Sequence, residues 1–228
     1  MKKILLSIFL VMLTFSALQA QRRNGLIGHR IESTGALVFT IGPSYSFADP
    51  DCSKGIFGPI INQNMFDNQH VSLGYRTTLS DYYGYKVSVG YDYFTGNDIK
   101  SPRNYSFETN AFQIAGQAEY YYHFGRRFRR RWPNTVYGFL GVGIITSNTV
   151  LNSPVRYTYY KYRDNDITPV IPYGAGYKYD IDNQFSVGAE IYWRYTFSDF
   201  LDGFKPHYPA SKSNDVLEGF LLTVSYQL

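Results

Sequence analysis

The sequence has little cysteine and little net charge. Cys52 is the one cysteine among 228 residues, which excludes an internal disulfide framework. Its distance from the start of the chain also does not suit lipid attachment near the N-terminus. Lys and Arg number 22 against 18 Asp and Glu, a formal net charge of +4. So small an excess of positive charge argues against nucleic acid as the main partner.

Long hydrophobic runs are missing beyond the first 20 residues. Lys2 and Lys3 precede an apolar stretch over residues 4–15, and small or polar residues follow up to Ala20. This order predicts a signal peptide over residues 1–20, cleaved after Ala20. No later run approaches the roughly 20 apolar residues of a membrane helix. We therefore expect an exported chain without a helical anchor.

Sequence motifs of common enzymes are absent as well. There is no glycine-rich phosphate loop with Lys, no HExxH, no paired CxxC and no GxSxG. Asp199, Asp202 and His207 are the best candidates for catalysis or metal binding, but a solvated, turn-forming acidic loop explains them more simply. We therefore expect a protein that is not an enzyme, with no catalytic residues, cofactor or metal site.

Aromatic residues, in contrast, are abundant. The chain has 23 Tyr, 17 Phe and 2 Trp, an aromatic share of 18%, while its mean hydropathy is only -0.27. That hydropathy is too low for a protein of membrane helices. It fits a transmembrane β-barrel, in which only the lipid-facing side is apolar.

The clearest periodic pattern covers residues 184–201. Apolar side chains from Phe185 to Phe197 fall on one face, and the other face carries Glu190 and Arg194 among small or polar residues. The alternation is longer than the mean soluble strand of about 5–6 residues. It suits a tilted transmembrane strand, which needs about 9–11 residues.

Seven further segments are predicted as strands. They are residues 35–47, 71–79, 83–93, 112–124, 136–146, 171–179 and 220–228. The segment 136–146 is apolar on both faces, so its sides are not assigned. Short turns at 80–83 and 180–183 alternate with long connections at 48–69, 96–106, 147–168 and 199–215.

These segments predict one all-β domain over residues 34–228. It is an eight-stranded antiparallel transmembrane β-barrel with short periplasmic turns and long extracellular loops, in the outer membrane, preceded by a periplasmic lead over residues 21–33. Closure is required because every backbone amide in hydrocarbon needs a partner. The last strand carries the expected insertion signal, in which Phe220 and Tyr226 replace the usual terminal aromatic residue. This signal comprises Phe220, Leu222, Val224, Tyr226 and Leu228.

The interior of an eight-stranded barrel is just wide enough for side chains to fill it. Charges buried there must be compensated, so we expect an internal network of ion pairs that plugs the barrel. Catalysis by Glu190 and Arg194 is the alternative. The predicted network comprises Arg76, Lys86, Asp92, Glu119, Lys178, Glu190 and Arg194.

A basic stretch occupies residues 125–134, where the topology requires a periplasmic turn. Arginine binds carboxylates and phosphates in a bidentate manner and stacks on aromatic rings. The stretch therefore suits either an acidic protein partner or anionic lipid headgroups, with Trp132 at the membrane interface. The candidate partner-binding residues are Arg126, Arg127, Phe128, Arg129, Arg130, Arg131 and Trp132.

Several segments carry a resemblance to a known family, and the block 188–202, GAEIYWRYTFSDFLD, is the most specific of them. The matching segments are residues 35–49, 88–98, 103–107, 111–124, 137–143, 170–202 and 219–228. In these segments the sequence resembles the PorG-like outer-membrane barrels of Bacteroidota, which are associated with the type IX secretion system.

The resemblance implies a non-enzymatic barrel, surrounded by outer-membrane lipids, that docks to a periplasmic lipoprotein ring in protein transport. It supplies no catalytic residues. A barrel enzyme, or an adhesion or ligand-binding barrel acting through its outer loops, is the alternative.

Overall fold

The computed structural model describes residues 35–47, 68–97, 106–124, 133–152, 163–197 and 216–228. All of them belong to the compact unit Ser33–Leu228. Within these ranges, no helix has the length and hydropathy to cross a membrane. The predicted signal peptide, the periplasmic lead 21–33 and the basic stretch 125–132 lie outside the described residues.

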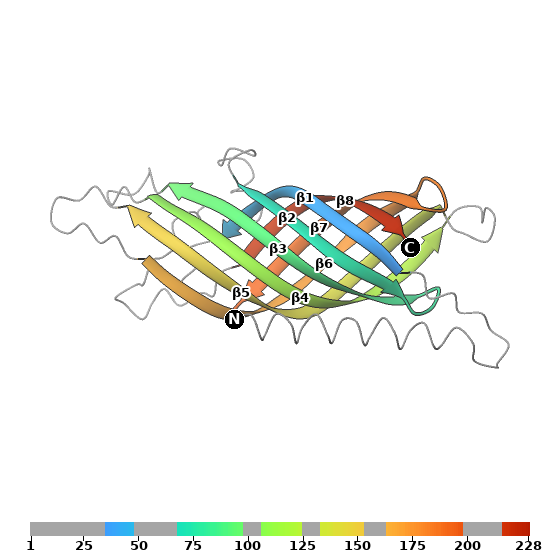
Figure 1. Cartoon of the computed structure of the whole chain (residues 1–228), viewed down its shortest axis with the longest axis horizontal. Helices are drawn as coiled ribbons and strands as arrows, with labels where there is room; N and C mark the ends of the chain where they lie inside the picture. Colours follow the sequence, from blue (N-terminus) through green and yellow to red (C-terminus); the bar gives the residue numbers. More distant parts are fainter. Residues whose placement is uncertain (1–34, 48–67, 98–105, 125–132, 153–162, 198–215) are drawn as a thin grey trace. The chain divides into compact units, whose positions relative to one another are not determined.

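Eight antiparallel strands form a closed barrel in chain order (Figure 1). The ladder between β1 and β8 closes the ring, from Ala36 opposite Gln227 to Phe47 opposite Val216. The predicted fold class is therefore confirmed. The strands are β1 (Gly35–Phe47), β2 (Gln69–Thr78), β3 (Tyr83–Asn97), β4 (Ser106–Phe124), β5 (Asn134–Asn152), β6 (Arg163–Asp180), β7 (Phe185–Thr196) and β8 (Val216–Gln227).

The two ends of the barrel differ in their connections. We call the end with the described turns 79–82 and 181–184 the turn end, and the other end, where the connections 48–67, 98–105, 153–162 and 198–215 leave the strands, the loop end. Gly35 and Leu228 also lie at the turn end, where the amide of Leu228 donates a hydrogen bond to the carbonyl of Gly35. The connection 125–132 joins β4 to β5 at this same end.

Side chains alternate between a lipid-facing outer surface and a packed interior along most of each strand. Aliphatic side chains occupy the middle of the outer surface, where Leu140 and Val142 are 61% and 71% exposed. Aromatic side chains lie nearer both ends: Tyr83 and Tyr120 pack together near the turn end, and Tyr173 stacks on Trp193 nearer the loop end. This is the distribution of a transmembrane barrel with aromatic girdles.

Glu218 is the exception on the outer surface. It shares the outward side of β8 with Phe220 and Leu222, yet it is buried, as is Tyr45 directly opposite on β1. A side-chain hydrogen bond links Glu218 to Trp193 of β7. The simple alternation therefore fails near the loop end, where a polar cluster replaces lipid-facing apolar side chains.

Several strands extend further toward the loop end than the sequence predicted. Residues 147–152 and 163–168 belong to β5 and β6, so the predicted loop 147–168 is too long at both ends, and β4 starts at Ser106 instead of residue 112. These extensions are polar, and a backbone ladder continues without an apolar face once a strand leaves hydrocarbon. The predicted strand over residues 184–201, in contrast, is too long. β7 is only Phe185–Thr196, and Phe197 lies in a bend after it.

Candidate functional site

The barrel interior contains two groups of charged and polar side chains. The group nearer the turn end, here called the turn-side layer, consists of Arg76, Lys86, Glu119, Glu190, Tyr121 and Tyr137. The group nearer the loop end, here called the loop-side layer, consists of Ser44, His70, Asp92, Gln113, Tyr192 and Arg194. Every one of these twelve side chains is at most 5% exposed.

Arg76 and Glu119 form the first ion pair of the turn-side layer. Arg76 Nη2 donates to Glu119 Oε1 at 3.0 Å, and Arg76 Nε lies 2.8 Å from Glu119 Oε2 without hydrogen-bond geometry. The hydroxyl of Tyr121 donates to Glu119 Oε2 at 2.5 Å. The carboxylate of Glu119 therefore contacts a cation and a neutral donor.

Glu190 is the centre of the second ion pair. Lys86 Nζ donates to Glu190 Oε1 and Oε2 at 3.2 and 3.3 Å, and the hydroxyl of Tyr137 donates to Oε1 at 2.6 Å. Arg76 Nη2 reaches the same oxygen at 3.4 Å and so joins the two pairs. Two cations and two carboxylates meet in this layer, so their formal charges cancel.

Arg194 organises the loop-side layer. Its Nη1 and Nη2 donate to the two carboxylate oxygens of Asp92 at 2.5 and 2.8 Å, in a bidentate ion pair. The same two nitrogens also donate to Gln113 Oε1 at 3.0 Å and Ser44 Oγ at 2.7 Å. His70 Nδ1 lies 2.8 Å from Asp92 Oδ1. This layer crosses the barrel from β1 to β4 and β7.

Glycines on β6 make room for the aromatic rings in the interior. Tyr137 of β5, Gly176 of β6 and Glu190 of β7 are consecutive neighbours across the sheet. A Cβ on Gly176 would lie 2.5 Å from Cζ of Tyr137, so the ring crosses the glycine to reach Glu190. Phe139 crosses Gly174 in the same way, and its ring centroid lies 5.7 Å from that of Tyr192.

Six of the seven predicted network residues lie in these two layers. Lys178 is also on the inward side of β6, but it lies nearer the turn end, where its Nζ is 3.3 Å from Asp180 Oδ1. It pairs within its own strand because the sequence places Asp180 two residues further along the same face. The predicted insertion residues of β8, from Phe220 to Leu228, all face outward and are exposed.

The sequence pattern does not indicate His70 or the uncharged members of the two layers. It also does not separate the two sides of β5, on which Tyr137, Phe139 and Ile145 are buried inside the barrel. Gly174 and Gly176 on the neighbouring strand were the signal that could have resolved these sides, because only glycine leaves space for a crossing ring. No group of three or more His, Cys, Asp or Glu that could hold a metal is present in the described part of the chain.

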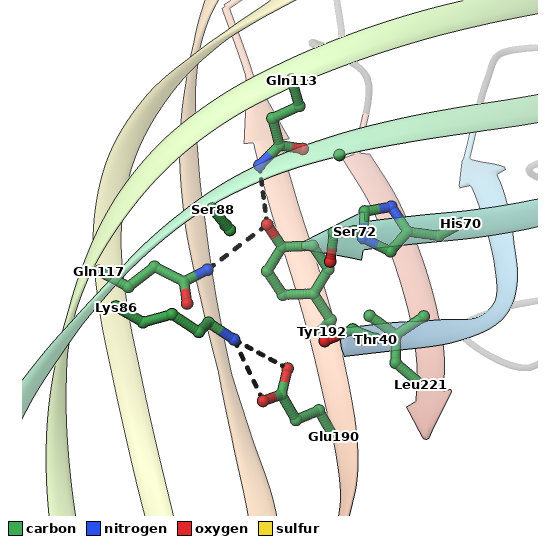
Figure 2. A pocket seen from close by; sticks show the side chains of 11 residues that line it. Thr40, His70, Ser72, Lys86, Ser88, Gln113, Gln117, Glu190, Tyr192 and Leu221 are labelled. Atoms are coloured by element: carbon green, nitrogen blue, oxygen red, sulfur yellow. Dashed lines mark hydrogen bonds and ion pairs between the residues drawn. The ribbon is translucent and has the colours of Figure 1, made fainter. Parts of the chain in front are cut away.

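One small cavity lies between the two layers (Figure 2). Its volume is about 10 Å³, close to the minimum that holds one water molecule. Lys86 and Glu190 line it from the turn side, and His70 and Gln113 from the loop side. This cavity is therefore too small for a substrate.

Comparison with known families identifies the barrel. The family model described as "Outer membrane protein beta-barrel domain" matches residues 7–227. The chain belongs to this family. Its location is the outer membrane, as the sequence predicted. No curated protein sequence matches the chain.

Solved structures show the same fold at low sequence identity. A major outer membrane protein from Thermus thermophilus has a TM-score of 0.53 and 10% identity, with 88% of this chain and 100% of that chain covered. Ail, the attachment invasion locus protein of Yersinia pestis, has a TM-score of 0.49 and 12% identity, covering 86% and 99%. Neisserial surface protein A has a TM-score of 0.48 and 11% identity, covering 85% and 97%. Such identities indicate a shared fold only.

Proposed function

We propose that this outer-membrane barrel is a non-enzymatic interaction component of the type IX protein secretion machinery. Its turn end, taken as periplasmic, docks to a periplasmic lipoprotein ring through the basic segment 126–131. The resemblance of residues 170–202 to PorG-like barrels motivates the choice of machinery. Outer-membrane lipids surround the barrel wall.

The filled interior is the observation that carries this proposal. Arg76, Glu119, Lys86 and Glu190 form compensated ion pairs across the lumen, and the cavity beside them has a volume of about 10 Å³. A solute path or a substrate pocket requires space that this part of the barrel does not have. Function therefore falls to the ends of the barrel, where chain segments leave the membrane.

The turn end, more than the loop end, carries a concentrated group of charges of one sign. β4 ends at Phe124 opposite Asn134 of β5, so the five arginines between them belong to this end. Guanidinium groups form bidentate contacts with carboxylates. A protein partner with an acidic surface would match these arginines. Anionic lipid headgroups are the competing ligand.

Charge reversal of Arg126, Arg127, Arg129, Arg130 and Arg131 to Glu tests the docking surface. Co-purification of the periplasmic lipoprotein from detergent-solubilised envelopes should be lost. Exposed ion pairs contribute about 0.2–1 kcal/mol each, so single reversals should have little effect and the five together a large one. Heat-modifiability on a gel should show that the variant barrel still folds.

A matched control reverses five basic residues at the loop end, namely Lys54, Lys100, Arg103, Arg156 and Lys161. Lipoprotein recovery should be unchanged by this control. Cys52 labelling by an impermeant maleimide on intact cells checks the orientation. Undiminished lipoprotein recovery with the arginine variant would show that docking uses another periplasmic segment, such as the lead around Arg22, Arg23 and Arg30. A displaced barrel with normal recovery would indicate a lipid anchor, which contributes about 1 kcal/mol per basic residue.

An enzyme, adhesion or ligand-binding barrel acting through the loop end is the second candidate. The polar extensions of β4, β5 and β6 favour it, because they carry the sheet further toward the loop end than β7, whose ladder with β6 ends at Thr196 opposite Val170. Asp199, Asp202 and His207 lie outside the described residues. Absence of any stoichiometric lipoprotein in the wild-type purification would favour this candidate.

A further inference from the structure

Most of the residues that line the cavity between the two layers have polar side chains. Hydroxyl groups of Thr40, Ser72 and Ser88 line it together with Lys86 and Gln117. Cavities that stay empty in proteins are lined by apolar side chains, whereas polar ones of sufficient size hold water. The composition of the lining therefore indicates an occupant that forms hydrogen bonds.

Two buried groups have hydrogen-bonding capacity left at this cavity. Gln117 is 3% exposed, and its Nε2 donates to the Tyr192 hydroxyl at 3.5 Å, while its Oε1 has no partner. Lys86 Nζ carries three N–H donors, and its hydrogen bonds in the described barrel all go to Glu190. Figure 2 shows the amide oxygen of Gln117 and the ammonium of Lys86 facing the same space. One is an acceptor and the other is a donor.

We propose that this cavity is a binding site for a single water molecule that bridges Lys86 and Gln117. The water accepts a hydrogen bond from Lys86 Nζ and donates one to Gln117 Oε1. The Ser88 hydroxyl, which lines the same cavity, accepts the second hydrogen bond that the water donates. Two to four such partners are what a buried water requires. The volume of about 10 Å³ fits one water and excludes a hydrated ion.

This water completes the plug. Lys86 and Glu190 belong to the turn-side layer, while Tyr192, which accepts from Gln117, also accepts from Gln113 of the loop-side layer at 2.8 Å. A water between Lys86 and Gln117 therefore joins the two layers into one hydrogen-bonded body. The inference concerns the interior alone and stands whether or not the turn end docks to a partner.

Substitutions of Ser88 distinguish a bound water from an empty space by the sign of their effect. Ser88→Val fills the cavity without offering a hydrogen bond, whereas Ser88→Ala leaves the cavity open. With a water in the site, the valine variant should have a folding equilibrium constant about tenfold or more below that of the alanine variant, because the larger side chain displaces the water from Lys86 and Gln117. With an empty site, valine should match or exceed alanine, and that result would overturn the proposal.

A direct measurement keeps the proposal testable if Ser88→Val fails to fold. In the wild-type barrel in lipid nanodiscs, the Gln117 side-chain amide should show an NMR cross-peak to a slowly exchanging water. The cross-peak should persist in Ser88→Ala, which removes no space. Its absence from both proteins would refute the bound water.

Discussion

Glu190 accepts side-chain hydrogen bonds from three other strands. It accepts from Lys86, Tyr137 and Arg76, which lie on three different strands. Each contact compensates part of the cost of burying a carboxylate at 1% exposure. Removal of this one side chain therefore affects β2, β3 and β5 at the same time.

Glu190→Ala should destabilise the barrel by about 3–5 kcal/mol, because it leaves the buried ammonium of Lys86 without its carboxylate. The unfolding free energy in denaturant, measured in lipid vesicles, checks this value. Glu108→Ala, at an exposed position of β4, is the control and should have little effect.

The double variant Glu190→Ala with Lys86→Met separates lost pairing from lost packing. It should recover part of the stability, because no uncompensated ammonium remains, although Arg76 keeps only Glu119 as its carboxylate. A double variant less stable than Glu190→Ala would contradict the assignment of the loss to a stranded charge.

At the scale of elements, the inner side of β6 leaves space for side chains that cross it between β5 and β7. Its glycines let the rings of Tyr137 and Phe139 pass over the strand toward Glu190 and Tyr192. The outer surface of the neighbouring strand behaves differently, because a Cβ on Gly138 would meet only the carbonyl oxygen of Gly174 at 3.8 Å. Glycine is thus required on the inner side of β6 and dispensable on the outer side of β5.

Gly176→Ala should lower the unfolding free energy by about 1–3 kcal/mol, the range for overpacking a buried site. The added methyl group displaces Tyr137 and removes its hydrogen bond to Glu190. Gly138→Ala serves as the matched control and should be neutral. Denaturant unfolding of both variants gives the comparison, and equal midpoints would show that the Tyr137 ring does not need the space above Gly176.

For the whole molecule, the two layers close the barrel interior. Arg194 with Asp92 and Arg76 with Glu119 form ion pairs at two levels of the lumen, and the space between them holds about one water molecule. We therefore expect no continuous water path through the interior.

The purified barrel in planar lipid bilayers should therefore show no stable single-channel steps. A larger porin reconstituted by the same procedure provides the positive control. Reproducible steps of large conductance that disappear when the barrel is omitted would refute the plug.

The sequence by itself determined the architecture. The predicted bounds of β1, Gly35 to Phe47, match the structure to the residue. Its alternation holds from Ala36 to Ile41, because a strand with lipid on one side keeps a period of two. The same alternation placed Arg76, Glu119 and Glu190 inside, since charges do not face hydrocarbon. It failed in the polar extensions of β5 and β6, where no hydrocarbon imposes a pattern.

Only the tertiary structure decided which interior groups meet. Glu119 and Arg76 are 43 residues apart in the sequence, and Arg194 and Asp92 are 102 apart. Their pairing depends on the register and closure of the barrel, which bring positions from separate strands to the same level. The inward side of β5 and the roles of Tyr121, Tyr137 and Gln117 follow from that register too, because an apolar segment between two glycine-bearing strands has no charge of its own to mark its inner face.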